Sequence, residues 1–135
     1  MRGVAGIGGE TAVWGPIVWR VLHDLAEVRG ESETGLWEEL GRVLPGSLAC
    51  AECQGHMTAW LATHPLGSSG PRLWMLDAHN AVNARLGRRV WSLNELDGVY
   101  RGCDPMMLTL EIRETLRESG LLGAEAVRVI ERMVE

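Results

Sequence analysis

Two cysteines three residues apart are the most reactive feature of the sequence. Cys50 and Cys53 form a Cys-x-x-Cys motif at the expected start of a helix. Unpaired N–H groups and the helix dipole at such a position lower the pKa of a thiol and favour the thiolate. A thiolate attacks disulfides, and this spacing allows the two sulfurs to close a small ring reversibly. The motif favours a redox-active disulfide over half of a metal site or a pair of inert thiols.

Histidine, asparagine and tryptophan recur on the expected helices around this pair. His56 lies one helical turn after the cysteines, while His79 and Asn83 are four residues apart on one face of a later helix. His23 lies four residues after Trp19 on the first helix. Each residue alone would be interpreted as a core or capping residue. Together they suit a helical bundle that binds a flat ligand with polar edges beside a disulfide.

The elements that must position these residues are predicted to be helices. Apolar residues at spacings of three and four predict helices over residues 14–28, 32–44, 50–63, 71–86, 92–99 and 105–118, and a last helix over about 126–134. We expect Ser32 to cap the second helix and Pro45-Gly46 to end it. Because no bounded run of residues alternates between apolar and polar, the expected fold class is all-α.

Composition excludes several functional classes. The chain has 135 residues, enough for one domain, and its formal net charge is −5. An acidic surplus argues against a general nucleic-acid partner. No apolar run approaches the ~20 residues that span a bilayer, so we expect no membrane insertion. The first ten residues lack an apolar stretch of secretory length, so we expect no export by that route.

Three segments resemble the Erv/ALR family of flavin-dependent sulfhydryl oxidases. The segment from Trp14 to Ala26 is similar to the family pattern W-G-P-x-x-W-x-x-L-H-x-x-A. Residues 50–57 are similar to C-x-x-C-x-x-H-F, and residues 74–88 to W-L-C-x-x-H-N-x-V-N-x-x-L-G-K. Each motif is weak by itself, but three in this order are specific. The resemblance covers residues 14 to about 102.

The resemblance implies a fold, a cofactor and a reaction. The fold would be a four-helix bundle with a short fifth helix, and FAD would lie in the mouth of the bundle. The implied enzyme is a flavin-linked thiol oxidase that oxidises dithiols of a protein substrate to disulfides. Electrons would pass through Cys50 and Cys53 to FAD and then to O₂, which would release hydrogen peroxide. Family members are usually homodimers, so the resemblance also implies a homodimer.

The same resemblance implies roles for individual residues. Cys53 would lie against the flavin ring, and Cys50 would exchange disulfides with the substrate. The implied cofactor site consists of Trp14, Trp19, His23, Cys53, His56, Trp74, His79, Asn80, Val82, Asn83, Arg88 and Tyr100. Arg88 stands where the family has Lys, and Tyr100 where it has a late Trp.

The chain departs from the family at a second, structural disulfide. Leu76 and Leu93 occupy its two cysteine positions. A disulfide that closes a loop of about 17 residues contributes ~3 kcal/mol in the chain-entropy model. Burial of one leucine contributes roughly 1.5–3 kcal/mol. We therefore expect Leu76 and Leu93 to be buried and in contact, replacing the bridge.

The predicted organisation has three parts. Residues 1–13 are expected to form a flexible arm, residues 14–102 the FAD-binding bundle and residues 103–135 a C-terminal extension of two helices. Short helices are marginal alone, so the extension must dock. Because family members dimerise through their first two helices, we expect the extension to cover a different face, near Cys103. Cys103 is a single extra thiol, for which an electron shuttle, an intersubunit bridge and a plain thiol remain open, the last being favoured.

Other classes of protein account for part of the pattern. A small zinc-binding module could use Cys50 and Cys53 with two of His56, His64 and His79. Its spacing is unusual, and it leaves the tryptophans and asparagines unexplained, so no metal site is expected. A thioredoxin-like protein needs strands that the pattern lacks, and a helical interaction protein without activity does not explain the intact motifs. Without a targeting segment, we favour a cytosolic or viral setting, with the mitochondrial intermembrane space as another option.

Overall fold

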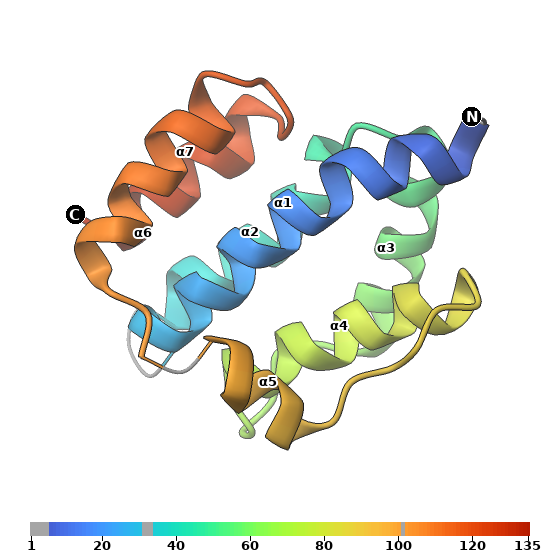
Figure 1. Cartoon of the computed structure of the whole chain (residues 1–135), viewed down its shortest axis with the longest axis horizontal. Helices are drawn as coiled ribbons and strands as arrows, with labels where there is room; N and C mark the ends of the chain where they lie inside the picture. Colours follow the sequence, from blue (N-terminus) through green and yellow to red (C-terminus); the bar gives the residue numbers. More distant parts are fainter. Residues whose placement is uncertain (1–5, 31–33, 101) are drawn as a thin grey trace.

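Every regular element that the structure describes is a helix, as the apolar periodicity predicts. The computed structural model describes residues 6–30, 34–100 and 102–135 (Figure 1). The elements are α1 (Gly6–Arg29), α2 (Thr34–Ser47), α3 (Ala51–Thr63), α4 (Pro71–Arg85), α5 (Leu93–Tyr100), α6 (Pro105–Glu111), the π-helix η1 (Ile112–Arg117) and α7 (Ala124–Met133). The fold class is therefore all-α. Among these elements, none is long and apolar enough to span a bilayer.

The long helix α1 lies at the centre of the molecule. It packs against α4 and α5 on one side and against α6 and η1 on the other, as Figure 1 shows. Its inward face is apolar at helical spacing and is fully buried at Val18, Val21, Leu22 and Leu25. Trp37 and Leu40 of α2 are equally buried in the same core. Both sides of α1 therefore depend on one continuous hydrophobic cluster.

Some helix boundaries differ from the predicted ones. Helix α1 begins at Gly6, so residues 6–13 are helical rather than part of the arm expected over residues 1–13. Helix α2 continues past Pro45 to Ser47, and the N–H of Leu48 closes its end on the carbonyl of Pro45 at 3.3 Å. A proline is tolerated there because the helix loses only one bond close to its end. The expected cap Ser32 lies outside the described residues.

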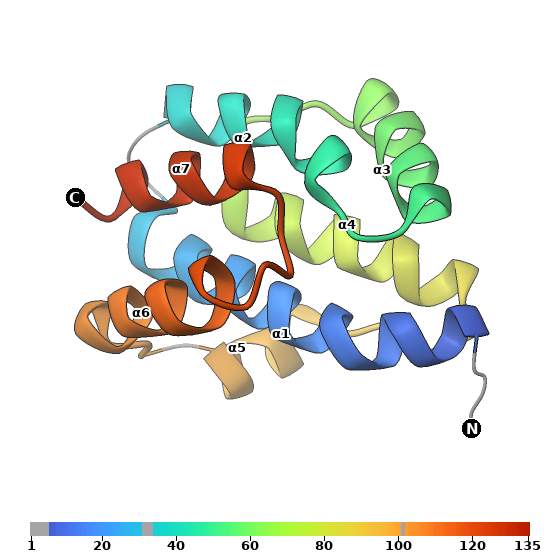
Figure 2. The same cartoon turned by 90° about the horizontal axis from the view of Figure 1, so that it is seen from above.

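The C-terminal extension packs on α1 and α2. The expectation that it covers a face other than that of a dimer stays a prediction. Helix α7 lies along α2, and α6 and η1 lie along α1 (Figure 2). Hydrogen bonds attach α7 to the bundle: the N–H of Gly123 donates to the carbonyl of Ser47 at 2.8 Å, Arg29 donates to the carbonyl of Met133 at 2.9 Å, and Arg132 donates to Glu39 at 3.1 Å. The surface that α6, η1 and α7 cover is consequently not free for a second subunit. The division at residues 102 and 103 and the homodimer remain predictions.

The expected replacement of the missing disulfide is only half present. Leu76 is buried, at 6 % exposure, but Leu93 is 41 % exposed, so the predicted contact between two buried leucines is wrong. Helix α5 buries Leu96 instead, whereas Leu93 stands at its first turn beside a groove lined by Pro71 and Arg72. Leu96 is thus the one fully buried side chain of this short helix.

A pair of carboxyl groups joins the extension to α1. Glu111 of α6 lies within hydrogen-bonding range of Asp24, and its buried Oε1 has no N–H donor, while Oε2 pairs with Arg20 at 3.1 Å. A proton shared between the two carboxyl groups satisfies both. Burial, followed by the bond to Asp24, raises the pKa of Glu111 to about 7. Deprotonation of this pair therefore opposes docking of α6.

We predict that Glu111→Gln stabilises the protein above neutral pH. A carboxyl whose folded pKa is raised contributes stability that is complete below its unfolded pKa of 4.5 and is lost as pH rises through about 7. Gln keeps a donor for Asp24 at every pH. Thermal melts at pH 8 should show a rise of about 3 °C or more, roughly 1 kcal/mol for a chain of this size. At pH 5 the variant and the parent should melt alike, and equal melting at pH 8 would contradict the shared proton.

Candidate functional site

The two cysteines of the Cys-x-x-Cys motif occupy different positions on α3. Cys50 is the N-cap, with extended backbone (φ −116°, ψ 125°), and its sulfur accepts a hydrogen bond from the N–H of Cys53 at 3.2 Å. Cys53 lies inside the first turn. Both are partly buried free thiols. The N-terminus of α3 is thus directed at the sulfur of Cys50, as the sequence predicts.

The environment of Cys53 differs from the expected one. Burial, together with the hydrogen bond and charge of Cys50, raises the pKa of its thiol to about 11, while Arg85 acts in the opposite direction. The prediction that the helix end lowers thiol pKa values is therefore wrong for Cys53. Its position in the first turn does not outweigh its partial removal from water.

Cys53 faces an apolar cavity of about 330 Å³, which we call the sulfur cavity. Its walls come from α1, the end of α2, α3 and α4, and consist of Val18, Trp19, Leu22, Leu44, Leu48, Cys53, His56, Met57, Ala59, Trp60, Ala78, Ala81, Val82 and Arg85. The helices converge here because each contributes a small or aliphatic residue at helical spacing. A flat apolar ring could therefore bind in contact with the sulfur.

A second recess lies next to the sulfur cavity and shares two residues with it. This recess, the ring groove, measures about 330 Å³ and is lined by Gly15, Pro16, Trp19, His79, Val82, Asn83, Arg88, Arg89, Trp91 and Tyr100. Trp19 and Val82 belong to both recesses. The two recesses are therefore neighbours, with a thiol in the wall of the first and aromatic rings and arginines in the wall of the second.

Aromatic rings stack on one another between α1 and α4. The imidazole of His79 stacks on Trp19, with centroids 4.4 Å apart and planes 6° apart, and its Nδ1 lies 2.9 Å from Nε2 of His23. Tyr100 of α5 stacks on His23 from the other side at 4.8 Å. Three helices therefore meet through aromatic rings at this point.

Both histidines of this stack are held neutral. Burial, followed by the charge of His79, lowers the pKa of His23 to about 3. Burial, followed by the charge of Arg88, lowers the pKa of His79 to about 4. A neutral imidazole has one donor and one acceptor nitrogen, so one ring can donate to the other. The site thus offers unprotonated rings for stacking at physiological pH.

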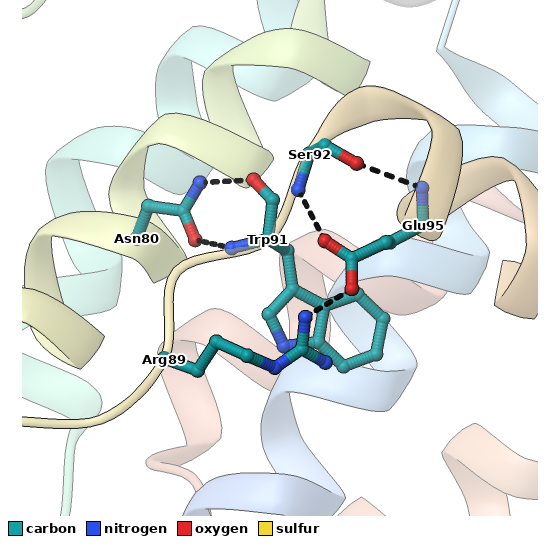
Figure 3. A network of polar contacts seen from close by, with 5 residues as sticks. All are labelled: Asn80, Arg89, Trp91, Ser92 and Glu95. Carbon is teal, nitrogen blue, oxygen red and sulfur yellow. Dashed lines mark hydrogen bonds and ion pairs between the residues drawn. The ribbon is translucent and has the colours of Figure 1, made fainter.

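Two of the expected cofactor residues hold the backbone instead of lining either recess. The side chain of Asn80 donates to the carbonyl of Trp91 and accepts from its N–H, both at 2.8 Å (Figure 3). Beyond it, Ser92 and Glu95 cap the start of α5. Asn80 thereby ties α4 to the segment that carries Trp91 and, further on, Tyr100.

Trp74 is the second of these residues. Its indole donates to the carbonyl of His64 at 2.8 Å and packs over Gly41 of α2, where a Cβ would lie 2.8 Å from the ring. It therefore fastens α4 to α2 and to the end of α3.

The other expected residues gather at the site. The sulfur cavity is lined by Cys53, His56, Trp19 and Val82. The ring groove is lined by His79, Asn83, Arg88 and Tyr100, and His23 hydrogen-bonds His79. The side chain of Trp14 lies outside the described part of the chain.

Arg85 is a site residue that the motifs missed. It stands in an unspecified position of the family pattern, but it follows Val82 by three residues and so shares its helix face. That spacing could have identified Arg85 as a residue of the site.

The histidines needed for a zinc site point in different directions. His56 lies 3.6 Å from Glu52, His64 stacks on Trp60 at 4.3 Å, and His79 bonds His23. Within the described ranges, no three residues of the metal-binding types come together. This arrangement does not favour the alternative of a zinc module.

The chemistry of the lining fits FAD. An extended ligand with a ring at each end would suit two recesses that share Trp19, and Arg88 and Arg89 supply positive charge for phosphate groups at the ring groove. Cys53 lines the sulfur cavity, so a ring bound there would lie beside its sulfur. The residues present could therefore hold this cofactor.

Fold and site together define an all-α protein with a Cys-x-x-Cys motif beside two neighbouring recesses. Residues 16–101 match the Erv1/Alr family, and the chain belongs to that family. The FAD-linked sulfhydryl oxidase of African swine fever virus, from a tick isolate from Malawi, is 31 % identical over 111 residues, which cover 76 % of this chain and 90 % of that protein. The protein of the same name from a pig isolate from Kenya is 29 % identical over the same shares.

We predict that the His23–His79 pair makes the protein sensitive to acid. A histidine whose folded pKa is lowered contributes stability above its unfolded pKa of 6.5, which is lost as pH falls towards the folded value of about 3. For His23 the loss between pH 7.5 and pH 5 is roughly 2 kcal/mol.

The matched variants are His23→Gln and His64→Gln. Denaturant melts at both pH values should show a smaller loss in His23→Gln, because Gln does not protonate. The exposed His64 provides the control, which should keep the wild-type loss. An undiminished loss in His23→Gln would disprove the buried neutral pair.

Proposed function

We propose that this protein is an FAD-dependent sulfhydryl oxidase that converts dithiols of a protein substrate to disulfides. Electrons leave the substrate through Cys50 and Cys53, and O₂ receives them as hydrogen peroxide. The observation that carries the proposal is the position of Cys53 in the wall of an apolar cavity that shares Trp19 and Val82 with a neighbouring groove of stacked rings. The names of the related viral proteins support the same activity.

FAD held in the two recesses would supply the redox chemistry, as the group through which two electrons would reach O₂. The residues that would hold it are Trp19, His79, Val82, Asn83, Arg88 and Tyr100, with Cys53 and His56 at the other end. Neutral His79 keeps its ring available for stacking, and Arg88 adds a positive charge.

The chain's own residues perform the thiol exchange. A substrate thiolate attacks the sulfur of Cys50 in the oxidised pair, the Cys50–Cys53 bond breaks, and its electron pair remains on Cys53. The second substrate thiolate then attacks the mixed disulfide at the substrate sulfur, which releases a substrate disulfide and the thiolate of Cys50. Two electrons have then moved from substrate to the cysteine pair. The N–H groups at the start of α3 support negative charge on Cys50.

We predict that Cys53→Ser and Cys50→Ser both lose dithiol oxidation while keeping flavin. Each removes one sulfur of the exchange but no residue of the ring groove. Oxygen consumption with a reduced protein substrate measures turnover, and the visible absorbance of the purified protein measures bound flavin. Activity should fall to the background rate in both variants.

Cys103→Ser is the matched control and should turn over like the wild type. Burial, followed by the charge of Asp24, raises the pKa of Cys103 to about 12, so that this thiol reacts slowly. Turnover at the wild-type rate in either motif variant, or a purified chain without flavin, would contradict the proposal.

A further inference from the structure

Arg85 is the last residue of α4 and reaches across to the start of α3. Its side chain, 26 % exposed, lines the sulfur cavity together with Cys53. Its Nη1 lies 3.9 Å from Oε1 of Glu52, the residue that precedes Cys53. A cation therefore lies close to the inner sulfur of the motif and lowers the pKa of its thiol.

The proposed thiol exchange requires Cys53 to act as a leaving group. In each turnover this sulfur must leave as a thiolate, and a leaving thiol departs more slowly as its pKa rises. Burial and Cys50 both raise the pKa of Cys53. Among the groups that act on this thiol, Arg85 is the one that lowers its pKa, by its charge and by its hydrogen bond.

We propose that Arg85 is a catalytic residue of the disulfide exchange, which stabilises the negative charge that forms on the sulfur of Cys53 when a substrate thiolate opens the Cys50–Cys53 disulfide. The inference rests on the proposed oxidase function, because it assigns a role within that reaction.

The step conserves atoms and electrons. The substrate thiolate forms a bond to the sulfur of Cys50, and the Cys50–Cys53 bond breaks. Its electron pair passes to Cys53, and the unit of negative charge moves from the substrate sulfur to this sulfur. The guanidinium stays protonated throughout and moves no proton. Arg85 acts by charge and by hydrogen bonds that strengthen as the thiolate forms.

Glu52 forms only a weak ion pair with the guanidinium of Arg85. Its carboxylate, which also approaches His56 at 3.6 Å, lies on the exposed side of Arg85, where water screens it. The weak pair leaves the inner face of the guanidinium to Cys53. A merely structural role is the other use of a basic residue in the last turn of a helix, since it complements the helix dipole. The two roles differ in what they do to the reactivity of Cys53.

The deciding measurement is the reactivity of Cys53 alone. In the full chain carrying Cys50→Ser and Cys103→Ser, Cys53 is the one remaining thiol, and its alkylation by iodoacetamide at pH 8 reports its thiolate fraction. Arg85→Gln should slow alkylation about threefold for each unit of pKa gained, because a tenfold loss of thiolate is partly offset by higher nucleophilicity. With both motif cysteines present and oxidised, Arg85→Gln should also slow reduction of the disulfide by dithiothreitol.

Matched variants separate the two roles. Arg128→Gln, at an exposed position of α7, should leave both rates unchanged. Arg85→Lys keeps a cation at the helix end and should recover most of the alkylation rate. If Arg85→Gln does not fold, Arg85→Met keeps the length of the side chain without its charge and should show the same slowing.

The outcomes also separate this inference from the proposed function. Unchanged alkylation and reduction rates in a folded Arg85→Gln protein would overturn the role of Arg85 and leave the oxidase proposal standing. A wild-type chain without flavin or oxidase activity would overturn the proposed function, whereas the measured effect of Arg85 on Cys53 needs neither.

Discussion

The contact between His23 and His79 determines how far apart α1 and α4 lie, and the site depends on that separation. The two rings meet at 2.9 Å between nitrogens, and Trp19 and Tyr100 stack on them. Because both imidazoles are neutral, they can be enclosed by aromatic rings without a counter-charge. The sulfur cavity is lined from both helices, so its width follows from this contact.

The two sulfurs of the motif receive different electrostatic support. Cys50 accepts an N–H bond at the start of α3, whereas Cys53 has lost part of its water and has Arg85 beside it. This difference matches the proposed division of labour, in which one sulfur meets the substrate and the other faces the cavity. Spacing alone makes the two cysteines equivalent, and the surrounding helices make them distinct.

The helices were accessible from the sequence because burial follows apolar spacing, whereas the candidate site residues followed from the resemblance to the Erv/ALR family. Each predicted helix has a counterpart, but the start of α1, the passage through Pro45 and the exposure of Leu93 depend on tertiary contacts that periodicity does not contain. The motifs also do not distinguish residues that line the recesses from residues whose side chains hydrogen-bond the backbone of a neighbouring segment. Asn80 and Trp74 belong to the second kind, since their polar groups bond carbonyls of neighbouring segments.

The wide turn of η1 has a consequence for the evolution of the extension. In this turn the N–H of Glu118 bonds the carbonyl of Arg113, five residues back, so the turn holds one residue more than an α-helix while Ile112 and Leu116 both stay buried. A single inserted residue would otherwise rotate everything that follows by about 100° about the helix axis. The turn absorbs such an insertion locally. Relatives could therefore differ by one residue in length here and still present the same apolar face to α1.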